Sequence, residues 1–208
     1  SSDVCSSDLG LYRMVKLVTV PENHFCMEYA GSNGIKVTPE VTILDAGAKK
    51  ADAEVTVELW IEGKSADVMV TVGDEKKSVP VEHGYAKAVF ELTNVHLWDG
   101  VDDPYLYTAK AELSDGDSVE TTFGCRSFSI DPQKGFFLNG RSYPLRGVSR
   151  HQDRAGAGNA LTNEMHREDM EIIKELGANT IRLAHYQHAQ EFYDLCDEYG
   201  ILLWEDLM

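Results

Sequence analysis

The chain has 208 residues, of which 43% are hydrophobic, 26% charged and 9% aromatic, a composition typical of folded domains. Its 35 Asp and Glu residues outnumber 19 Lys and Arg residues, and the formal net charge of −16 opposes binding to nucleic-acid phosphates and anionic membrane surfaces. No run approaches the ~20 apolar residues of a membrane span. We therefore expect a cytoplasmic protein with neither nucleic acid nor membrane among its partners.

The first nine residues, SSDVCSSDL, follow no hydrophobic period, and we interpret residues 1–9 as non-native sequence. The cysteines, Cys5, Cys26, Cys125 and Cys196, are widely spaced and form no C-x-x-C pair. This spacing indicates neither a zinc knuckle nor a dense disulfide framework. We expect free thiols.

Residues 22–130 contain short alternating runs of apolar and polar residues, such as VTVELW at 55–60 and VMVTV at 68–72. Turn residues, including Gly73-Asp74 and His83-Gly84, separate the runs. This pattern is typical of antiparallel strands that are buried on one face. We predict an immunoglobulin-like β-sandwich of about seven strands over residues 22–130.

The pattern changes at residue 131. Residues 136–143 predict a hairpin around Asn139-Gly140, and residues 145–149 predict a further short strand. Two helices are then predicted, at about 162–176 and 189–199, with strands at 180–184 and 201–204. The apolar residues expected on one face of the first helix are Met165, Ile172, Ile173 and Leu176.

Strands that alternate with helices imply a parallel sheet. Neither a G-x-G-x-x-G nor a G-x-x-x-x-G-K motif follows these strands, which favours a (β/α)₈ barrel over a nucleotide-binding fold. Since a complete barrel takes ~250 residues, the segment 131–208 can supply only the first three strands of a truncated one.

Functional side chains of parallel α/β folds gather where the strands end. His151 and Asp153 follow the first strand, His185 and Tyr186 follow the second, and Glu205-Asp206 follow the third. Imidazoles, phenols and carboxylates around one concave site suit the hydroxyl groups of a sugar. The pattern therefore favours a carbohydrate ligand.

At this point the sequence carries a resemblance to a known family. The segment from Phe137 to Trp204 resembles the opening of the barrel of family 2 glycoside hydrolases, and is closest to the β-galactosidase-like members. The motifs that match, in the family's order, are FFLNG, LRGVSRHQD, NTIRLAHYQH and FYDLCDEYG. Upstream, GLYR resembles the end of the family's jelly-roll domain, and LWDGVDDPYLYTAKAEL with TTFGCRSFSI resembles the close of its immunoglobulin-like domain.

The resemblance implies a domain order. Residues 10–21 correspond to the last strand of a missing jelly-roll domain, 22–130 to the immunoglobulin-like sandwich, and 131–208 to the N-terminal part of an incomplete TIM barrel. Family members are retaining enzymes that use two glutamates, which by resemblance lie on later barrel strands. We therefore expect a β-galactosidase fragment that contains no catalytic residue and hydrolyses nothing by itself.

What carries over is a substrate-binding set: His151, Arg182, His185, Tyr186 and Asp153. The chain reads WEDLM where related sequences commonly read WAEIP, so Glu205 and Asp206 are assigned no catalytic role. The resemblance implies a β-galactoside or related sugar as partner and a homo-oligomeric parent. It implies no metal ligand or cofactor in this chain, with Mg²⁺ or Na⁺ only in the longer protein.

Other interpretations remain open at this point. The parent could be a β-glucuronidase or β-mannosidase of the same architecture, or the chain a non-catalytic carbohydrate-binding or interaction module. Arg182 could hold carboxylates in a buried network instead of contacting sugar. His188 is interpreted as structural, and Trp60 and Trp98 as core or interface residues rather than sugar platforms. A metal cluster that includes Cys196 is disfavoured, because Cys196 falls on the apolar stripe of a predicted helix.

Overall fold

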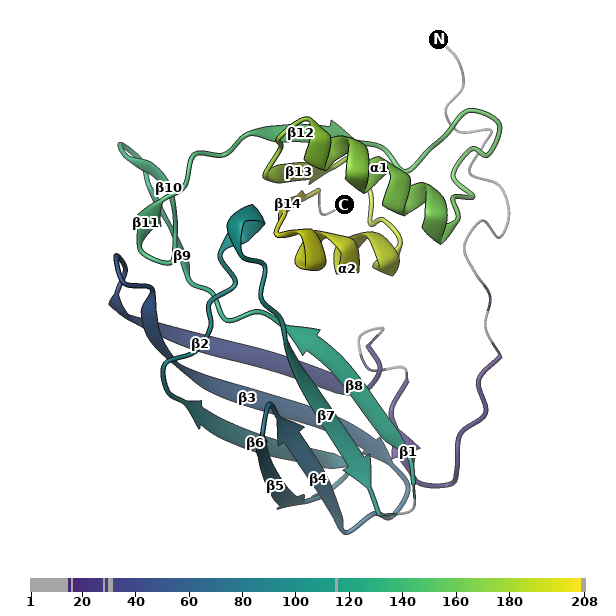
Figure 1. Cartoon of the computed structure of the whole chain (residues 1–208). Helices are drawn as coiled ribbons and strands as arrows, with labels where there is room; N and C mark the ends of the chain where they lie inside the picture. Colours follow the sequence, from purple (N-terminus) through teal and green to yellow (C-terminus); the bar gives the residue numbers. More distant parts are fainter. Residues whose placement is uncertain (1–14, 16, 28, 30–31, 115, 207–208) are drawn as a thin grey trace. The chain divides into compact units, whose positions relative to one another are not determined.

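The computed structural model describes residues 15, 17–27, 29, 32–114 and 116–206. The predicted jelly-roll motif at 10–13, and residues 1–9, lie outside this part of the chain. The chain divides into two compact units, which we describe separately. Residues 18–99 and 105–143 form a β unit, and residues 100–104 and 144–206 fall in an α/β unit (Figure 1). No helix in the described ranges is long and apolar enough to cross a membrane.

The β unit is a sandwich of two antiparallel sheets. One sheet has the order β1-β3-β2 with β6 also paired to β3, and the other has the order β5-β4-β7-β8. The described residues thus place eight strands in the sandwich, where the sequence predicted about seven. Their bounds are β1 His24–Phe25, β2 Ile35–Asp45, β3 Lys50–Glu62, β4 Asp67–Val72, β5 Glu75–Pro80, β6 Tyr85–Leu92, β7 Tyr107–Leu113 and β8 Ser118–Phe123.

Strand β3 shows why this segment folds as a sandwich. Every second side chain from Ala51 to Ile61 is buried, while those between them are partly or fully exposed. Because successive side chains of a strand point to opposite faces, this alternation covers one face with apolar groups and leaves the other to solvent. Trp98 is fully buried, as predicted, while Trp60 is half-buried and stacks on Tyr29 with ring centroids 3.7 Å apart.

A small sheet follows the sandwich, with the order β11-β10-β9, formed by β9 Phe128–Asp131, β10 Gly135–Leu138 and β11 Arg141–Ser142. The predicted hairpin is confirmed: β10 pairs with β11 around Asn139-Gly140, where both residues have positive φ angles (51° and 74°). The Asn139 side chain accepts from the Ser127 backbone amide and donates to the Trp98 carbonyl oxygen. The turn is thereby tied to the sandwich.

Asp99, which is 2% exposed, is a charged group that the sequence did not single out. Its carboxylate accepts from Lys49 Nζ at 2.7 Å, from Asn139 Nδ2 at 3.1 Å and from Arg141. Burial by itself raises the pKa of Asp99, but the hydrogen bonds from Lys49, Arg141 and Asn139 outweigh it and hold the pKa below its usual value. A buried carboxylate is tolerated here because three donors replace water.

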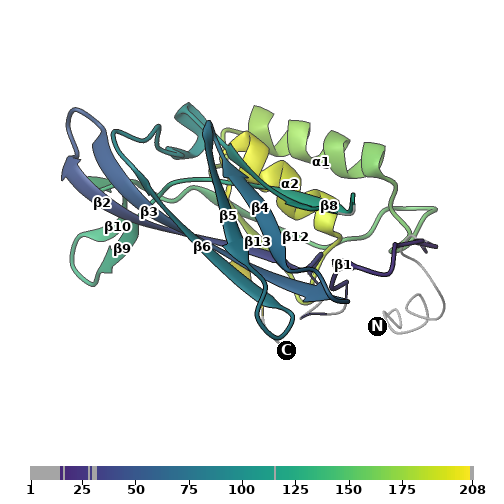
Figure 2. The same ribbon diagram turned by 90° about the horizontal axis from the view of Figure 1, so that it is seen from below.

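The α/β unit contains three parallel strands in the order β12-β13-β14: β12 Gly147–Arg150, β13 Thr180–Leu183 and β14 Leu202–Glu205. The predicted parallel arrangement is therefore confirmed, although β12 begins two residues and ends one residue later than predicted. Helices α1 Asn163–Glu175 and α2 Gln190–Tyr199 connect the strands and pack on one side of them (Figure 2). Their shared core contains Met170, Ile173, Ala178, Ile181, Leu183, Phe192, Leu195, Cys196 and Ile201.

Helix α1 begins as predicted but turns a different face to the core. Thr162 is the N-cap, and its hydroxyl accepts from the Met165 backbone amide. The buried residues are His166, Met170 and Ile173, whereas Ile172 and Leu176 are 55% and 69% exposed. The predicted face was wrong for those two residues because a polar side chain, His166, occupies the buried stripe.

Helix α2 matches its prediction, with Phe192, Leu195 and Cys196 buried. It ends at Gly200, whose φ of 74° is left-handed, as at many helix ends. A Cβ atom at residue 200 would fall on the backbone carbonyl of Gly100, closer than Cβ atoms approach such groups. Gly200 is therefore required both by its conformation and by the close approach of the short 3₁₀ helix Gly100–Asp102.

This contact predicts different costs for two glycine substitutions. Gly177, which follows α1, has a φ of 73° but nothing within 4 Å of an added Cβ atom. Gly177→Ala should lower the free energy of unfolding by about 1 kcal/mol, the cost of a left-handed alanine. Gly200→Ala should lower it by roughly 3 kcal/mol or more, because overpacking adds to that cost. Urea unfolding of both variants measures the difference, and equal losses would contradict it.

The described cysteines predict a labelling pattern. Cys125 and Cys196 are fully buried, whereas Cys26 is partly exposed. Burial raises the pKa of Cys125 to about 11 and raises the pKa of Cys196 as well, so neither forms the reactive thiolate near neutral pH. Iodoacetamide at pH 8 should modify Cys26 in the folded protein, and Cys125 and Cys196 only in denaturant. Peptide mass spectrometry assigns each site, and modification of Cys196 in the native state would contradict the expectation.

Candidate functional site

The carboxyl ends of the three parallel strands bring the predicted residues to one rim. Residue 149 pairs with residue 182, and residue 182 with residue 204, so the segments after Arg150, Leu183 and Glu205 begin at the same edge. The rings of His151 and His185 lie 5.2 Å apart, edge to face, and the ring of Tyr186 lies 6.4 Å from His151. The rings of three of the five predicted residues therefore lie close together.

Arg182 and His185 share a carboxylate. Asp206 accepts from Arg182 Nε at 3.2 Å and Nη2 at 2.6 Å, and its Oδ2 lies 2.8 Å from His185 Nδ1. Arg182 Nη2 also lies 3.2 Å from His185 Nδ1, farther than the carboxylate oxygen. Because an ionised carboxylate only accepts hydrogen bonds, we assign the Nδ1 proton of His185 to this shorter contact, which leaves Nε2 as the nitrogen that can meet a ligand. Hydrogen bonds from His185 and then from Arg182 hold the pKa of Asp206 below its usual value.

Tyr186 is held at the rim by the segment after β12. Its hydroxyl oxygen accepts from the backbone amide of Gln152 at 3.2 Å. Gln152 is 1% exposed, and its side-chain oxygen accepts from the backbone amide of Ala189, the N-cap of α2, at 2.6 Å. Asp153, the fifth predicted residue, follows Gln152 in the chain and is exposed.

Arg150, the last residue of β12, lies beneath the rim and is 7% exposed. Its Nε and Nη2 donate to Asp169 Oδ2 at 3.1 and 2.7 Å. Nη2 also lies 3.0 Å from His166 Nδ1, and Nη1 lies 3.1 Å from His188 Nδ1. The guanidinium carbon is 3.9 Å from the centre of the Phe192 ring. Asp169 accepts a second arginine, Arg154 Nη2, at 3.0 Å.

These contacts determine the state of two imidazoles. A guanidinium carries donors only, so His166 and His188 must both accept through Nδ1. Both rings are then neutral with the proton on Nε2, and in His188 that atom lies 3.4 Å from the carbonyl oxygen of Ala184. The prediction that His188 is structural agrees with this burial (2% exposed) and these partners.

The face of the sheet opposite the helices presents a row of three side chains in register, Ser149, Arg182 and Trp204. Trp204 is 66% exposed. An exposed indole in register with a guanidinium offers an apolar surface for a sugar ring together with donors for its hydroxyl groups. The sequence interpretation did not single out Trp204, although its place one residue before Glu205-Asp206 on the third strand was a usable signal.

A metal cluster that includes Cys196 was disfavoured from the sequence. Within the described residues, no three His, Cys, Asp or Glu side chains converge so that they could hold an ion. Cys196, which a cluster with His151 and His185 would need, lies in the core between helices and sheet.

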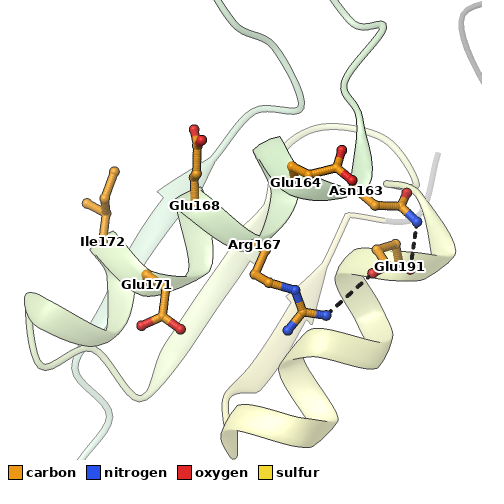
Figure 3. Close-up of a pocket in the computed structure, with 7 residues that line it drawn as sticks. All are labelled: Asn163, Glu164, Arg167, Glu168, Glu171, Ile172 and Glu191. Carbon is orange, nitrogen blue, oxygen red and sulfur yellow. Dashed lines mark hydrogen bonds and ion pairs between the residues drawn. The ribbon is translucent and has the colours of Figure 1, made fainter.

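A separate hollow of about 710 Å³ lies on the surface of α1 and α2 (Figure 3). Four glutamates line it together with Arg167, which lies 3.8 Å from Glu191. Asn163 also donates to Glu191, at 3.3 Å. None of the predicted site residues lines this hollow, so its carboxylates form a solvated helix surface distinct from the rim.

Two family models match the chain. The model of glycosyl hydrolases family 2 matches residues 28–126, and the model of the glycosyl hydrolases family 2 TIM barrel domain matches residues 130–207. Together they cover the sandwich and the α/β unit.

Individual relatives match along most of the chain. A β-glucuronidase of Bacteroides fragilis is 37% identical over 217 aligned residues, which are 95% of this chain and 30% of that protein. The structure of a putative β-galactosidase from Bacteroides fragilis superposes with a TM-score of 0.79 at 34% identity, over 89% of this chain and 30% of that one. The apo structure of Bacteroides uniformis β-glucuronidase 3 superposes with a TM-score of 0.79 at 36% identity, over 94% of this chain and 24% of that one. The chain thus spans less than a third of each relative.

The shared carboxylate predicts how the pKa of Asp206 responds to substitution. His185→Ala and Arg182→Ala should each raise that pKa toward the usual aspartate value, because each removes a donor to the ionised form. With the folded pKa below the unfolded one, this contact stabilises the fold above the usual aspartate pKa and is lost as pH falls through the lowered value. Carboxyl ¹³C NMR measures the pKa, with His96→Ala in the sandwich as control. An unchanged pKa in both rim variants would contradict the assignment.

Proposed function

Because the chain belongs to glycoside hydrolase family 2, we propose that its three strand ends form the first part of the sugar-binding cup of a retaining β-glycosidase. The observation that carries this proposal is the meeting of His151, His185 and Tyr186 at one rim, with rings 5.2 and 6.4 Å apart. Two exposed imidazoles and a half-buried phenol at this spacing can contact neighbouring hydroxyl groups of one pyranose ring.

Each rim residue has a proposed role. His151 and His185 hydrogen-bond ring hydroxyls, and Tyr186 and Trp204 contact the apolar face of the sugar. Arg182 orients Asp206, which in turn fixes the His185 ring, so Arg182 acts through its neighbours as well as through charge. Asp153 is exposed in the segment after β12 and is the weakest candidate of the set.

The carboxylates at the rim have other partners. Glu205 accepts from the Tyr193 hydroxyl, and Asp206 from Arg182 and His185. Retaining glycosidases need two carboxyl groups about 5–5.5 Å apart, one as nucleophile and one as acid/base. We assign neither role to Glu205 or Asp206, and propose that both catalytic glutamates lie in the parts of the whole protein that this chain does not span. The 208-residue chain itself should bind sugar weakly and hydrolyse none.

For the substrate we propose a β-D-glucuronide first and a β-D-galactoside second. The sequence motifs favour galactoside, whereas the β-glucuronidase of Bacteroides fragilis aligns with 95% of the chain at 37% identity. Relatives named β-galactosidase match as well, which supports the second candidate. We further propose that the whole protein is a cytoplasmic homo-oligomer. We also propose that it has no nucleic-acid or membrane partner, because the net charge of −16 opposes binding to both. Any Mg²⁺ or Na⁺ would be held by residues outside this chain.

The substrate proposal predicts an order of activities. The protein expressed from the whole reading frame that contains this chain should hydrolyse p-nitrophenyl β-D-glucuronide with a higher kcat/KM than the matching galactoside or mannoside. His151→Ala and His185→Ala should each lower kcat/KM by about 10²-fold, the effect of losing one hydrogen bond that strengthens in the transition state. His96→Ala, a histidine in the sandwich, serves as the control.

The outcomes separate the candidates. A preference for the galactoside would show that the galactoside, and not the glucuronide, is the substrate, and would leave the proposed glycosidase activity standing. No hydrolysis of any β-glycoside, combined with sugar binding by the 208-residue chain, favours the carbohydrate-binding module. Full activity in both rim variants would reject the site.

A further inference from the structure

We infer that Arg150 is a positioning residue: its buried guanidinium fixes the two loops that carry His151 and His185 at the spacing a sugar ring requires. This inference rests on the proposed sugar site, and concerns a residue that the sequence did not single out. Arg150 lies beneath the rim, where it contacts the neighbours of the sugar-binding groups.

The first loop is held through helix α1. Arg150 directly precedes His151 in the chain, and its Nε and Nη2 both donate to Asp169 on α1 at 3.1 and 2.7 Å. Arg154, four residues later in the same loop, donates to the other oxygen of Asp169 at 3.0 Å and to Glu168 at 2.6 Å. One carboxylate thus anchors both ends of the loop that carries His151.

The second loop is held by the opposite side of the same guanidinium. Nη1 of Arg150 contacts Nδ1 of His188 at 3.1 Å, and His188 follows His185 by three residues. The backbone carbonyl oxygen of Arg150 accepts from the Ala184 amide at 3.0 Å, directly before His185. A single residue therefore contacts the second loop on both sides of His185.

The shape of the side chain matters as well as its charge. Arg150 meets three acceptors in different directions and stacks on Phe192 at 3.9 Å. A planar guanidinium has five donors fixed in a fork, whereas a lysine ammonium is a compact charge with three. Lysine at residue 150 would keep the charge but could not reach Asp169, His166 and His188 together. The loops would then lose their common anchor.

The experiment compares Arg150→Lys with Ile173→Val, which removes one methylene from the same core without touching either loop. In the chain labelled at its histidines, NMR measures the nuclear Overhauser contact between the rings of His151 and His185, 5.2 Å apart. Titration with p-nitrophenyl β-D-glucuronide and p-nitrophenyl β-D-galactoside measures sugar affinity, at a temperature where both variants are folded. If Arg150→Lys does not fold, Asp169→Asn removes the anchor in its place.

Arg150→Lys should abolish the ring contact and weaken sugar binding by about tenfold or more, whereas Ile173→Val should leave both unchanged. Arg150→Lys with an intact ring contact overturns the inference, whether or not affinity falls. If Arg150→Lys loses the ring contact and the unsubstituted chain binds neither sugar, the positioning role is supported and the proposed function is rejected. The two claims therefore fail on different results.

Discussion

The parallel register of β12, β13 and β14 is the constraint on which the rest of the site depends. Parallel strands end at a common edge, so residues far apart in sequence leave the sheet side by side. Strand alternation then sorts their side chains: Ile181 and Leu183 face the helices, while Arg182 faces the opposite side. A slip of one residue would exchange these faces and remove the guanidinium from the rim.

The rim is stabilised mainly by polar contacts beneath it. Arg150, His166 and His188 are buried among apolar side chains and are tolerated because each is paired. Removing one member of such a group costs more than the group contributes as a whole, since the others lose their partners. The site therefore behaves as a unit, in which both loops keep their geometry or lose it together. In the sandwich, Asp99 follows the same rule with Lys49 and Arg141.

Elements with a clear hydrophobic period could be predicted from the sequence. The alternation in β3, the Asn139-Gly140 hairpin, the start of α1 near residue 162 and the stripe on α2 all follow from local chemistry, and the structure confirms them. The rim position of His151 and His185 followed from topology, because strand ends meet whatever their side chains. The family motifs then supported the expectation of a sugar as the ligand.

Contacts between polar groups distant in sequence could not be predicted in this way. Hydrophobicity marks His166 as a surface residue, yet it is 1% exposed because Arg150 supplies a donor. Because His166 occupies a position on the buried stripe of α1, Ile172 is exposed where the apolar pattern predicted burial. The pairing of Arg182 with Asp206 spans 24 residues and depends on the register of two strands. Such hydrogen-bond partners can be identified only when the positions of the strands in the sheet are known.

The most direct test of the shared rim is a map of sugar contacts on the chain in solution. The account predicts that adding p-nitrophenyl β-D-glucuronide shifts the NMR signals of His151, His185 and Trp204 together, with one common affinity. Shifts confined to Trp60 and Tyr29 on the sandwich, or different affinities for His151 and His185, would contradict it.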